Sequence, residues 1–389
     1  MRVLFVDDDQ RLLDGLRTLL RKQRTHWTME FALGGEAALA AIDQAPFDVV
    51  VSDMRMPGID GAELLAQIKH REPRTVRIIL SGQTAHADLV RTMAVAHQFL
   101  SKPCSADTLR SLLERMRRLR SLLPDPAIRG VIGALDRLPS VPSAHAELED
   151  ALARPSVKLA ELAAVLARDP ASSLKVLQLA HSDYFGQAEP PSSIHGAVGH
   201  LGLQTLKELA VSAHVFSTPP TASIEGFSLT TLQQHAIATA DLARRLADPA
   251  GADAAFTAGL LHDVGLLVLA LGFPDRFAEA VRTVQSTGEP QDRVEQQMFG
   301  FSHAEIGGYL LGIWGLPMTI VDAVAHHHAP ARLAEGALAT LAVVHVATAL
   351  VDGRPDRIDT GFLEAAGLAE RLPRWREIAD APTDPAQAP

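Results

Sequence analysis

Four short apolar segments near the N-terminus each end beside side chains that can handle phosphate. Val3–Val6 precedes Asp7 and Asp8, Val49–Ser52 precedes Asp53, Ile78–Leu80 precedes Ser81, and Phe99–Leu100 is followed closely by Lys102. The carboxyl ends of the strands in an open parallel sheet line one crevice, so these side chains should converge. Three neighbouring carboxylates repel one another, and a hard divalent cation such as Mg²⁺ relieves that repulsion. The pattern predicts a magnesium site at which an aspartate receives phosphate.

The elements that must position these side chains alternate between strand and helix from residue 1 to about 123. Buried strand runs are separated by segments with apolar residues at helical spacing, which predicts a doubly wound, flavodoxin-like α/β domain. Pro124-Asp125-Pro126 then interrupts the last helix. Beyond it the strand pattern disappears and helical spacing continues to about Ile378, so the second part is predicted to be all-α.

Composition limits the class of protein. The single cysteine, Cys104, excludes an internal disulfide and fits a reducing cytosol. The N-terminus enters a strand without a secretory signal, and the longest apolar stretch, Ala337–Val351, is 15 residues, short of the roughly 20 that span a bilayer. We therefore expect a cytoplasmic protein without membrane contact.

Charge is distributed unevenly along the chain. Residues 1–123 contain 18 Lys+Arg and 15 Asp+Glu, whereas the remainder contains 18 basic and 31 acidic residues. A helical part this acidic is poorly suited to the phosphate backbone, so we expect no nucleic acid partner.

Residues 1–123 resemble the receiver domain of two-component response regulators along their whole length. The matching motifs are Asp7-Asp8, Ser52-Asp53-Met-Arg-Met-Pro-Gly58, Ser81-Gly82 and Lys102-Pro103. The resemblance implies that a sensor histidine kinase phosphorylates Asp53. It also implies that Mg²⁺ is held by Asp8, Asp53 and the backbone carbonyl of Arg55, with Asp7 acting mainly through water.

The same resemblance assigns switch functions to three residues. Ser81 would bind a phosphoryl oxygen, Lys102 would neutralise phosphoryl charge, and Phe99 occupies the position of a switch aromatic. A plain buried strand aromatic is an equal interpretation of Phe99. The Lys102–Pro103 bond is usually cis in such domains. The basic last helix, with Arg115, Arg117, Arg118 and Arg120, is either a solvated face or a contact that would allow a homodimer through the last two receiver helices.

The helical part contains an unusual set of histidines. They are His235, the pair His262-Asp263, His303, the run His326-His327-His328, and His345. The pair His262-Asp263 is flanked on both sides by apolar residues that predict a buried helix. A polar pair there must be hydrogen-bonded, paired or ligated, and imidazole with carboxylate suits a transition metal.

This part resembles the HDOD branch (HD-related output domain) of the HD superfamily of metal-dependent phosphohydrolases. The motifs that carry the resemblance are Leu138–Pro142, Val165–Pro170, Ser193-Ile194, Gly259–Gly265, Trp314–Pro317, and His326-His327 followed by Pro330. We expect a linker at 124–137, the output domain at 138–332, a helical extension at 333–380 and a disordered tail at 381–389. The resemblance implies a candidate metal set of His235, His262, Asp263, His303, His326 and His327.

The chain departs from catalytic members at two positions. A later metal-binding aspartate is replaced by Thr348, with Asp352 one helical turn further on as a substitute only if the register allows. Leu266 stands where cyclic-dinucleotide phosphodiesterases carry a lysine, and their Gly-Tyr-Pro motif is missing. Three hypotheses remain: a polar core in a non-catalytic interaction module, a bound metal without turnover, and a phosphorylation-gated hydrolase of a nucleotide or cyclic dinucleotide. No residue is assigned a catalytic role.

Overall fold

A computed structural model describes residues 1–21, 27–82, 91–182, 191–213, 216, 223–333, 336 and 338–381. Five strands form one parallel sheet in the order β2-β1-β3-β4-β5, which confirms the predicted doubly wound fold. The strands are β1 (Arg2–Asp7), β2 (Thr28–Leu33), β3 (Val49–Asp53), β4 (Val76–Ser81) and β5 (Gln98–Ser101). The helices of this domain that the structure describes are α1 (Gln10–Leu19), α2 (Gly35–Gln44), α3 (Gly61–Arg71) and α5 (Ala106–Leu122).

The alternation of side chains along each strand buries both faces of the sheet. Val3, Phe5 and Val51 face the side with α1 and α5, whereas Leu4 and Val50 face α2 and α3. Strands that are apolar on both faces are typical of parallel sheets covered by helices. The carboxylates Asp7 and Asp53 stand at the last positions of their strands, beyond this apolar core.

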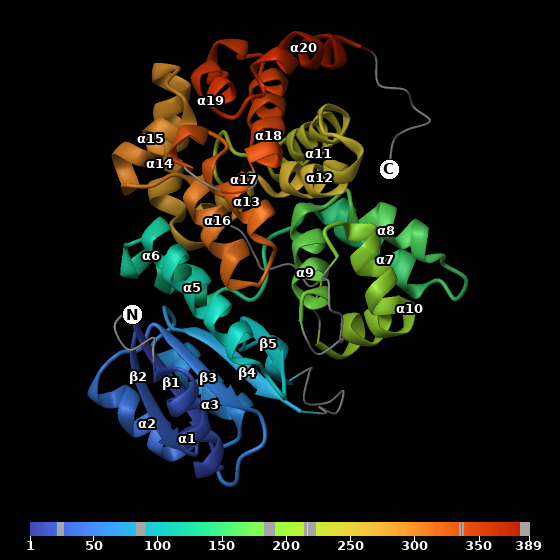
Figure 1. Ribbon diagram of the computed structural model, residues 1–389. Helices are drawn as coiled ribbons and strands as arrows, with labels where there is room; N and C mark the ends of the chain where they lie inside the picture. The colour runs from blue at the N-terminus through green and yellow to red at the C-terminus, as the bar shows by residue number, and fades with distance from the viewer. Residues whose placement is uncertain are drawn as a thin grey trace.

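The second part is helical, as predicted. Its helices are α6 (Pro126–Ala134), α7 (Pro142–Ala153), α8 (Leu159–Leu166), α9 (Pro170–Ala180), α10 (Ile194–Ala213), α11 (Leu229–Leu246), α12 (Ala252–Leu261), α13 (Val264–Gly272), α14 (Pro274–Thr287), α15 (Gln291–Phe299), α16 (His303–Ile313), α17 (Met318–His326), α18 (Leu338–Val351), α19 (Thr360–Ala365) and α20 (Leu372–Asp380). Figure 1 shows α7 to α10 as one group beside a second group that contains α11 to α20.

Residues 124–137, predicted as a linker, are mostly helical. Asp125 caps α6 by accepting hydrogen bonds from the amides of Ala127 and Ile128, and Pro126 occupies the first turn. Ile128 and Ile132 are buried, and α6 packs against α3, α13 and α16. In Figure 1, α5 and α6 lie between the sheet and α16. The apolar core consequently continues without a break from the sheet into the helical part.

One apolar stretch of the described chain, Pro249–Gly272, is long enough by composition to cross a membrane, but 89% of its apolar window is buried inside the protein. It comprises two helices, α12 and α13, that separate at His262 and Asp263. The prediction that this pair lies inside a single helix was therefore wrong.

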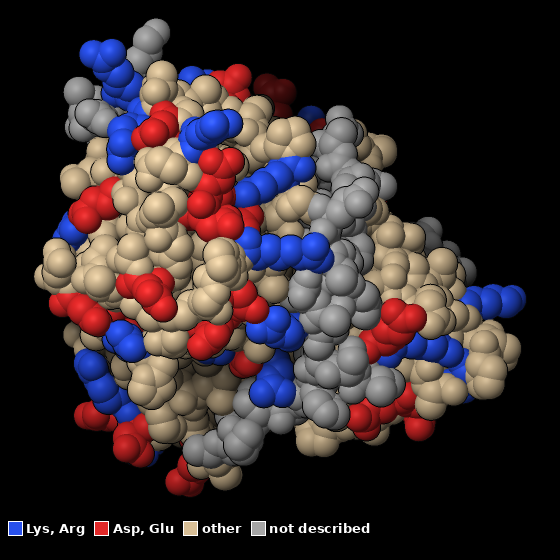
Figure 2. All heavy atoms as spheres, turned by 90° about the horizontal axis from the view of Figure 1, so that it is seen from below, with Lys and Arg blue, Asp and Glu red and all other residues tan. Residues whose placement is uncertain are grey.

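On the face in Figure 2, which is the receiver end of the molecule, basic and acidic side chains are intermixed.

Candidate functional site

The strand ends bring together the predicted phosphate-binding residues. Asp7 ends β1, Asp53 ends β3 and Ser81 ends β4. The strand register pairs Asp53 with Leu80, and Ser81 with Ser101, which precedes Lys102. Each residue is therefore carried to the same edge of the sheet by a strand that hydrogen-bonds to its neighbour.

Lys102 joins the two buried carboxylates at this edge. Its Nζ lies 2.7 Å from Asp7 Oδ2 and forms an ion pair with Asp53 Oδ1. Burial would lower the pKa of Lys102, but hydrogen bonds and charge from Asp53 and Asp7 outweigh it and raise the pKa. Lys102 is therefore held in its charged form, which suits a group that must neutralise phosphate.

The remaining receiver residues differ in how they are held. The other oxygen of Asp53, Oδ2, accepts a hydrogen bond of 2.6 Å from the amide of Arg55, while Asp8 is exposed at the rim. Phe99 is partly buried and contacts the cores on both faces of the sheet. The Lys102–Pro103 peptide is cis, as expected. The donor set of Asp8, Asp53 and the Arg55 carbonyl consists of oxygens only, which is the chemistry that Mg²⁺ requires.

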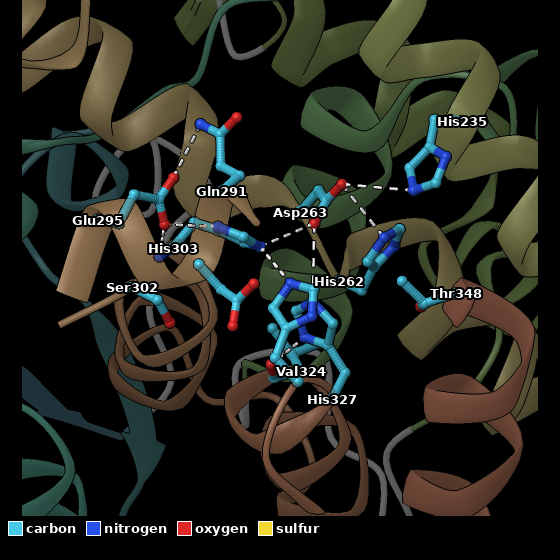
Figure 3. Close-up of polar contacts among 12 residues, drawn as sticks. His235, His262, Asp263, Gln291, Glu295, Ser302, His303, Val324, His327 and Thr348 are labelled. Carbon is cyan, nitrogen blue, oxygen red and sulfur yellow. Dashed lines mark hydrogen bonds and ion pairs between the residues drawn. The ribbon is translucent and has the colours of Figure 1, made fainter. Parts of the chain in front are cut away.

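A second cluster of polar residues lies inside the helical part, around Asp263. His235 comes from α11, His262 from the end of α12, His303 from the start of α16, and His327 from the turn after α17 (Figure 3). His262 Nε2 lies 3.2 Å from Asp263 Oδ2, and His303 Nε2 lies 3.2 Å from Asp263 Oδ1. His235 and His327 are further out, with Nε2 atoms at 3.7 and 3.8 Å from the same carboxylate.

Three imidazoles in this cluster are oriented by acceptors behind them. His262 Nδ1 lies 2.6 Å from the carbonyl of Gly259, and His327 Nδ1 lies 2.8 Å from that of Val324. His303 Nδ1 lies 2.6 Å from Glu295 Oε2. A carbonyl or carboxylate acceptor requires a proton on Nδ1, which in the neutral ring leaves a lone pair on Nε2. Nε2 is the atom that faces Asp263 in all three, and this is how metal-binding histidines are usually held.

The buried polar atoms fit such a ligand set. Among the described residues, Nε2 of His262 and Nε2 of His327 are buried without a hydrogen-bond partner. Asp263, His303, His327 and His328 form one group close enough to hold a single ion, and His235, His262 and Asp263 form another. Asp263 is common to both groups. The cluster therefore has imidazole and carboxylate donors that would suit a transition metal, and Asp263 would contribute to either group.

Protonation in the cluster is set by the central carboxylate. Burial would raise the pKa of Asp263, but the charge of His262 at 3.2 Å and the contact with His303 lower it well below its usual range. Burial would lower the pKa of His303, yet Glu295 and Asp263 raise it well above 6.5. Burial and the neighbouring imidazoles lower the pKa of His327 and His328. These directions favour an ionised Asp263, a charged His303 and neutral rings at His327 and His328, and a metal ion that bound His303 would displace the proton from its Nε2.

Two members of the histidine run occupy places that differ from the predicted set. His326 points away from Asp263 and lines a cavity with Arg118, Asp322 and Arg332. His328 instead joins the cluster, with Nε2 at 3.0 Å from His303 Nε2. The reason is helical geometry: His326 is one turn beyond Asp322 and shares its face of α17, while the chain after the helix end turns His328 inward.

The residues at the end of α18 also have defined contacts. Thr348 donates a 2.9 Å hydrogen bond to the carbonyl of Val344 within its own helix, and its neutral hydroxyl is a weaker metal ligand than a carboxylate. Asp352 Oδ1 lies 3.7 Å from His235 Nε2, so the register does allow this carboxylate to approach the cluster. His345 hydrogen-bonds the carbonyl of His327 and the amide of Asp359 and fixes the loop after α17.

Glu295 is the residue that sequence reasoning missed. Its carboxylate is completely buried, accepts the amide and Nδ1 protons of His303, and is itself held by Gln291 at 3.0 Å (Figure 3). Its signals in the sequence are a carboxylate eight residues before a predicted ligand and a helix start at Gln291.

A cavity of about 720 Å³ opens beside His328. It is lined by Arg293, Arg332, Arg354 and Arg357 and by the acids Asp292, Glu305, Asp356 and Asp359.

Comparison with known protein families decides the classification. The response regulator receiver domain matches residues 3–114 and the HDOD domain matches residues 138–330. The chain is a response regulator with an HDOD domain. The receiver match covers the sheet domain that carries Asp7, Asp53 and Lys102, and the HDOD match covers the helices that surround the histidine cluster.

Individual relatives match only parts of the chain. An uncharacterised protein of Treponema pallidum is 27% identical over 198 residues, which is 50% of this chain and 38% of the relative. The DNA-binding transcriptional regulator NtrC of Salmonella typhimurium is 40% identical over 118 residues, 29% of this chain and 24% of the relative. The chain thus spans well under two thirds of these relatives.

Among solved structures, a virulence factor of Campylobacter jejuni aligns with a TM-score of 0.52 at 13% identity. It covers 64% of this response regulator and 95% of that chain. At this identity the likeness concerns the fold alone.

Proposed function

We propose that this response regulator acts in a phosphorelay in which a sensor histidine kinase phosphorylates Asp53 with Mg²⁺, and the HDOD domain delivers the output. The observation that carries the proposal is the bridge from Lys102 to Asp7 and Asp53 at one edge of the sheet. A charged lysine between two buried carboxylates is the arrangement that a transferred phosphoryl group needs around it.

The receiver residues supply positioning and charge. Asp8, Asp53 and the carbonyl of Arg55 would hold Mg²⁺, which would neutralise charge on the phosphoryl oxygens. The amide of Arg55 fixes Oδ2 of Asp53, so the other oxygen of Asp53 faces Lys102. Lys102 would then exchange its ion pair with Asp53 for one with the phosphoryl group. Ser81, at the adjacent strand end, would bind a further phosphoryl oxygen.

Phosphorylation is tested on the full chain with acetyl phosphate and Mg²⁺, read by intact mass. The wild type should gain one phosphoryl group, and Asp53→Asn should gain none. Asp14→Asn is a matched control, because Asp14 is an exposed carboxylate on α1 that pairs with Arg17. Undiminished labelling of Asp53→Asn would show that the acceptor lies elsewhere.

For the HDOD domain we propose a metal-binding centre at Asp263, which is favoured by the three oriented imidazoles and the buried carboxylate behind His303. Such a centre without turnover is the form we favour, since Thr348 provides no carboxylate and Leu266 provides no positive charge. A phosphorylation-gated hydrolase of a nucleotide or cyclic dinucleotide is the alternative. The arginines of the cavity beside His328 favour that alternative, but three of them pair with cavity acids.

The histidine run offers its own control for this centre. His327→Asn should remove bound transition metal, measured by elemental analysis of the purified chain, whereas His326→Asn should leave it unchanged. Equal metal content in both variants would mean that the cluster is a polar core. Phosphate release from a nucleotide that tracks the metal content would favour the hydrolase.

We further propose that the protein works in the cytoplasm through a protein partner and not on nucleic acid. The helical part carries 31 acidic and 18 basic residues, and acidic surfaces repel the phosphate backbone. A gel-shift at moderate salt should show no retarded DNA, and a stable complex would refute this assignment.

A further inference from the structure

The face of the receiver formed by β5 and α5 contacts two helices of the HDOD domain, at the C-terminal end of α16 and at the middle of α17. The side-chain amide of Gln98 in β5 donates hydrogen bonds of 3.3 and 2.8 Å to the carbonyls of Gly312 and Ile313 at the end of α16. Arg115 of α5 holds the other end of this amide, at 2.5 Å from Gln98 Oε1. Gln98 precedes Phe99, so the contact begins beside the predicted switch residue.

A second contact ties α5 to α17. The guanidinium of Arg118 lies 2.7 Å from Asp322, whose side chain is 5% exposed. Burial raises the pKa of Asp322 and the charge of Arg118 counteracts that rise. The next residue of α5, Leu119, packs against Gly312, where a Cβ would collide with the leucine side chain. The small residue on α16 lets α5 approach closely.

The same two helices also carry cluster residues. His303 is the first residue of α16, and His327 and His328 directly follow α17. A helix of the length of α16 is about 16 Å long and runs from the receiver contact to the cluster, whereas in α17 Asp322 lies about one turn before the end of the helix that leads to His327. The two helices are in close contact at Gly308, where a Cβ would meet Ala325 at 2.5 Å. They are therefore packed as one unit.

The donors of the cluster come from two pairs of helices, of which only α16 and α17 carry the contacts with the receiver described above. His303, His327 and His328 belong to the pair of helices that the receiver contacts, while His235 and His262 belong to α11 and α12. We infer that α16 and α17 couple phosphorylation of Asp53 to the spacing of the histidine cluster. A shift of the β5–α5 face would displace the histidines carried by α16 and α17 relative to those carried by α11 and α12. The distances from Asp263 to both sets would then change.

This inference rests on the proposed function, because Asp53 must accept phosphate for the receiver to have two states. A ligand shifts such an equilibrium only by the difference in its interaction with the two states. Coupling between two sites is typically about 1–3 kcal/mol, a change of roughly 5- to 150-fold in affinity, and it is reciprocal. A divalent transition metal at the cluster and phosphate at Asp53 should therefore alter each other's binding.

The experiment compares the full chain before and after acetyl phosphate, with Asp53 occupancy read by intact mass. Hydrogen exchange is followed in peptides covering 303–313 and 318–328, and the affinity for Co²⁺ is measured by its visible absorption. Phosphorylation should change exchange at His303 and at 326–328 by about fivefold or more, and Co²⁺ affinity by a similar factor. Arg118→Gln, alone and with Gln98→Leu, should strongly reduce both responses while Asp53 is still labelled.

Arg117→Gln is the matched control, since Arg117 is on the same helix but its guanidinium is exposed and pairs with Glu114 of α5 itself. It should respond as the wild type does. Labelled Asp53 with unchanged exchange in both peptides overturns the coupling and leaves the phosphoacceptor role intact. A response that persists in the Arg118 and Gln98 variants also overturns the assigned route. A chain in which Asp53 takes no label overturns the proposed function and the coupling together.

Discussion

Glu295 is the residue whose replacement tests the histidine cluster most sharply. Its buried carboxylate accepts three hydrogen bonds, two from His303 at 2.7 and 2.6 Å and one from Gln291 at 3.0 Å. Glu295→Gln preserves the size and shape of the side chain and removes its charge. The glutamine oxygen can still accept from His303, and the amide of Gln291 can turn to accept from the new NH₂ group.

The expected magnitude follows from these contacts. A hydrogen bond to a charged group contributes about 1.5–3 kcal/mol and a neutral one about 0.5–1.5 kcal/mol, so each contact should weaken by about 1 kcal/mol. Three contacts give a loss of about 2–3 kcal/mol in the free energy of unfolding. The Nε2 of His303 also becomes a weaker donor, and loss of such an outer partner typically costs about 10- to 100-fold in metal affinity.

The assay is urea unfolding of the full chain together with titration of Co²⁺. Glu289→Gln is the control: Glu289 is exposed and accepts one hydrogen bond from Gln297, so its replacement should change stability by less than about 0.5 kcal/mol. Glu295→Leu should be worse than Glu295→Gln, because it leaves two buried donors of His303 without an acceptor. If Glu295→Gln matched wild type in both stability and Co²⁺ affinity, the argument that this carboxylate orients His303 and strengthens its Nε2 as a metal donor would be refuted.

Three further predictions concern His181, Gly265 and Asp352. Burial lowers the pKa of His181 from 6.5 to about 4, so the unfolded chain binds a proton that the folded chain excludes, and stability should fall by up to about 3 kcal/mol between pH 6.5 and 4. His181→Asn should flatten that acid limb in unfolding curves recorded across this range. Gly265→Ala would force a methyl group onto the backbone of His303, and we expect a loss of at least about 1–3 kcal/mol in urea unfolding; a neutral variant would contradict this packing. Asp352→Asn should weaken metal binding on the His235 side by about tenfold in Co²⁺ titration, while Asp356→Asn, an exposed surface pair, should not.

The receiver fold and its strand-end residues could be predicted because the information is local. Each polar residue follows an apolar strand, and the parallel sheet brings strand ends to one edge whatever the loops do. The start of α6 could also be predicted, because Asp125 followed by Pro126 is a typical helix start. The linker predicted at 124–137 rests on the prolines alone and leaves this signal out.

The histidine cluster could be predicted only in part. Residue types and the apolar setting identified His262, Asp263 and His303, but choosing between His326 and His328 requires knowing which face of α17 meets the receiver. That face is decided by the contact of Arg118 with Asp322, which joins positions 204 residues apart. Glu295 belongs to no sequence motif. Its contact with His303 depends on how α15 packs against α16, which the neighbouring residues in the sequence do not determine.

The unbroken apolar core between the two parts has a consequence for how such regulators can be recombined. Arg77 of β4 donates a 2.6 Å hydrogen bond to the carbonyl of Gly133 in α6, and Ile132 beside it is completely buried. A junction placed after α5 would separate α6 from α3 and β4 of the receiver and would expose apolar surface on both products. A receiver grafted from another regulator should therefore be exchanged together with α6, and with a residue at position 98 that can still reach α16. The receiver and the HDOD helices are therefore exchangeable only together with α6, because α6 packs against both of them.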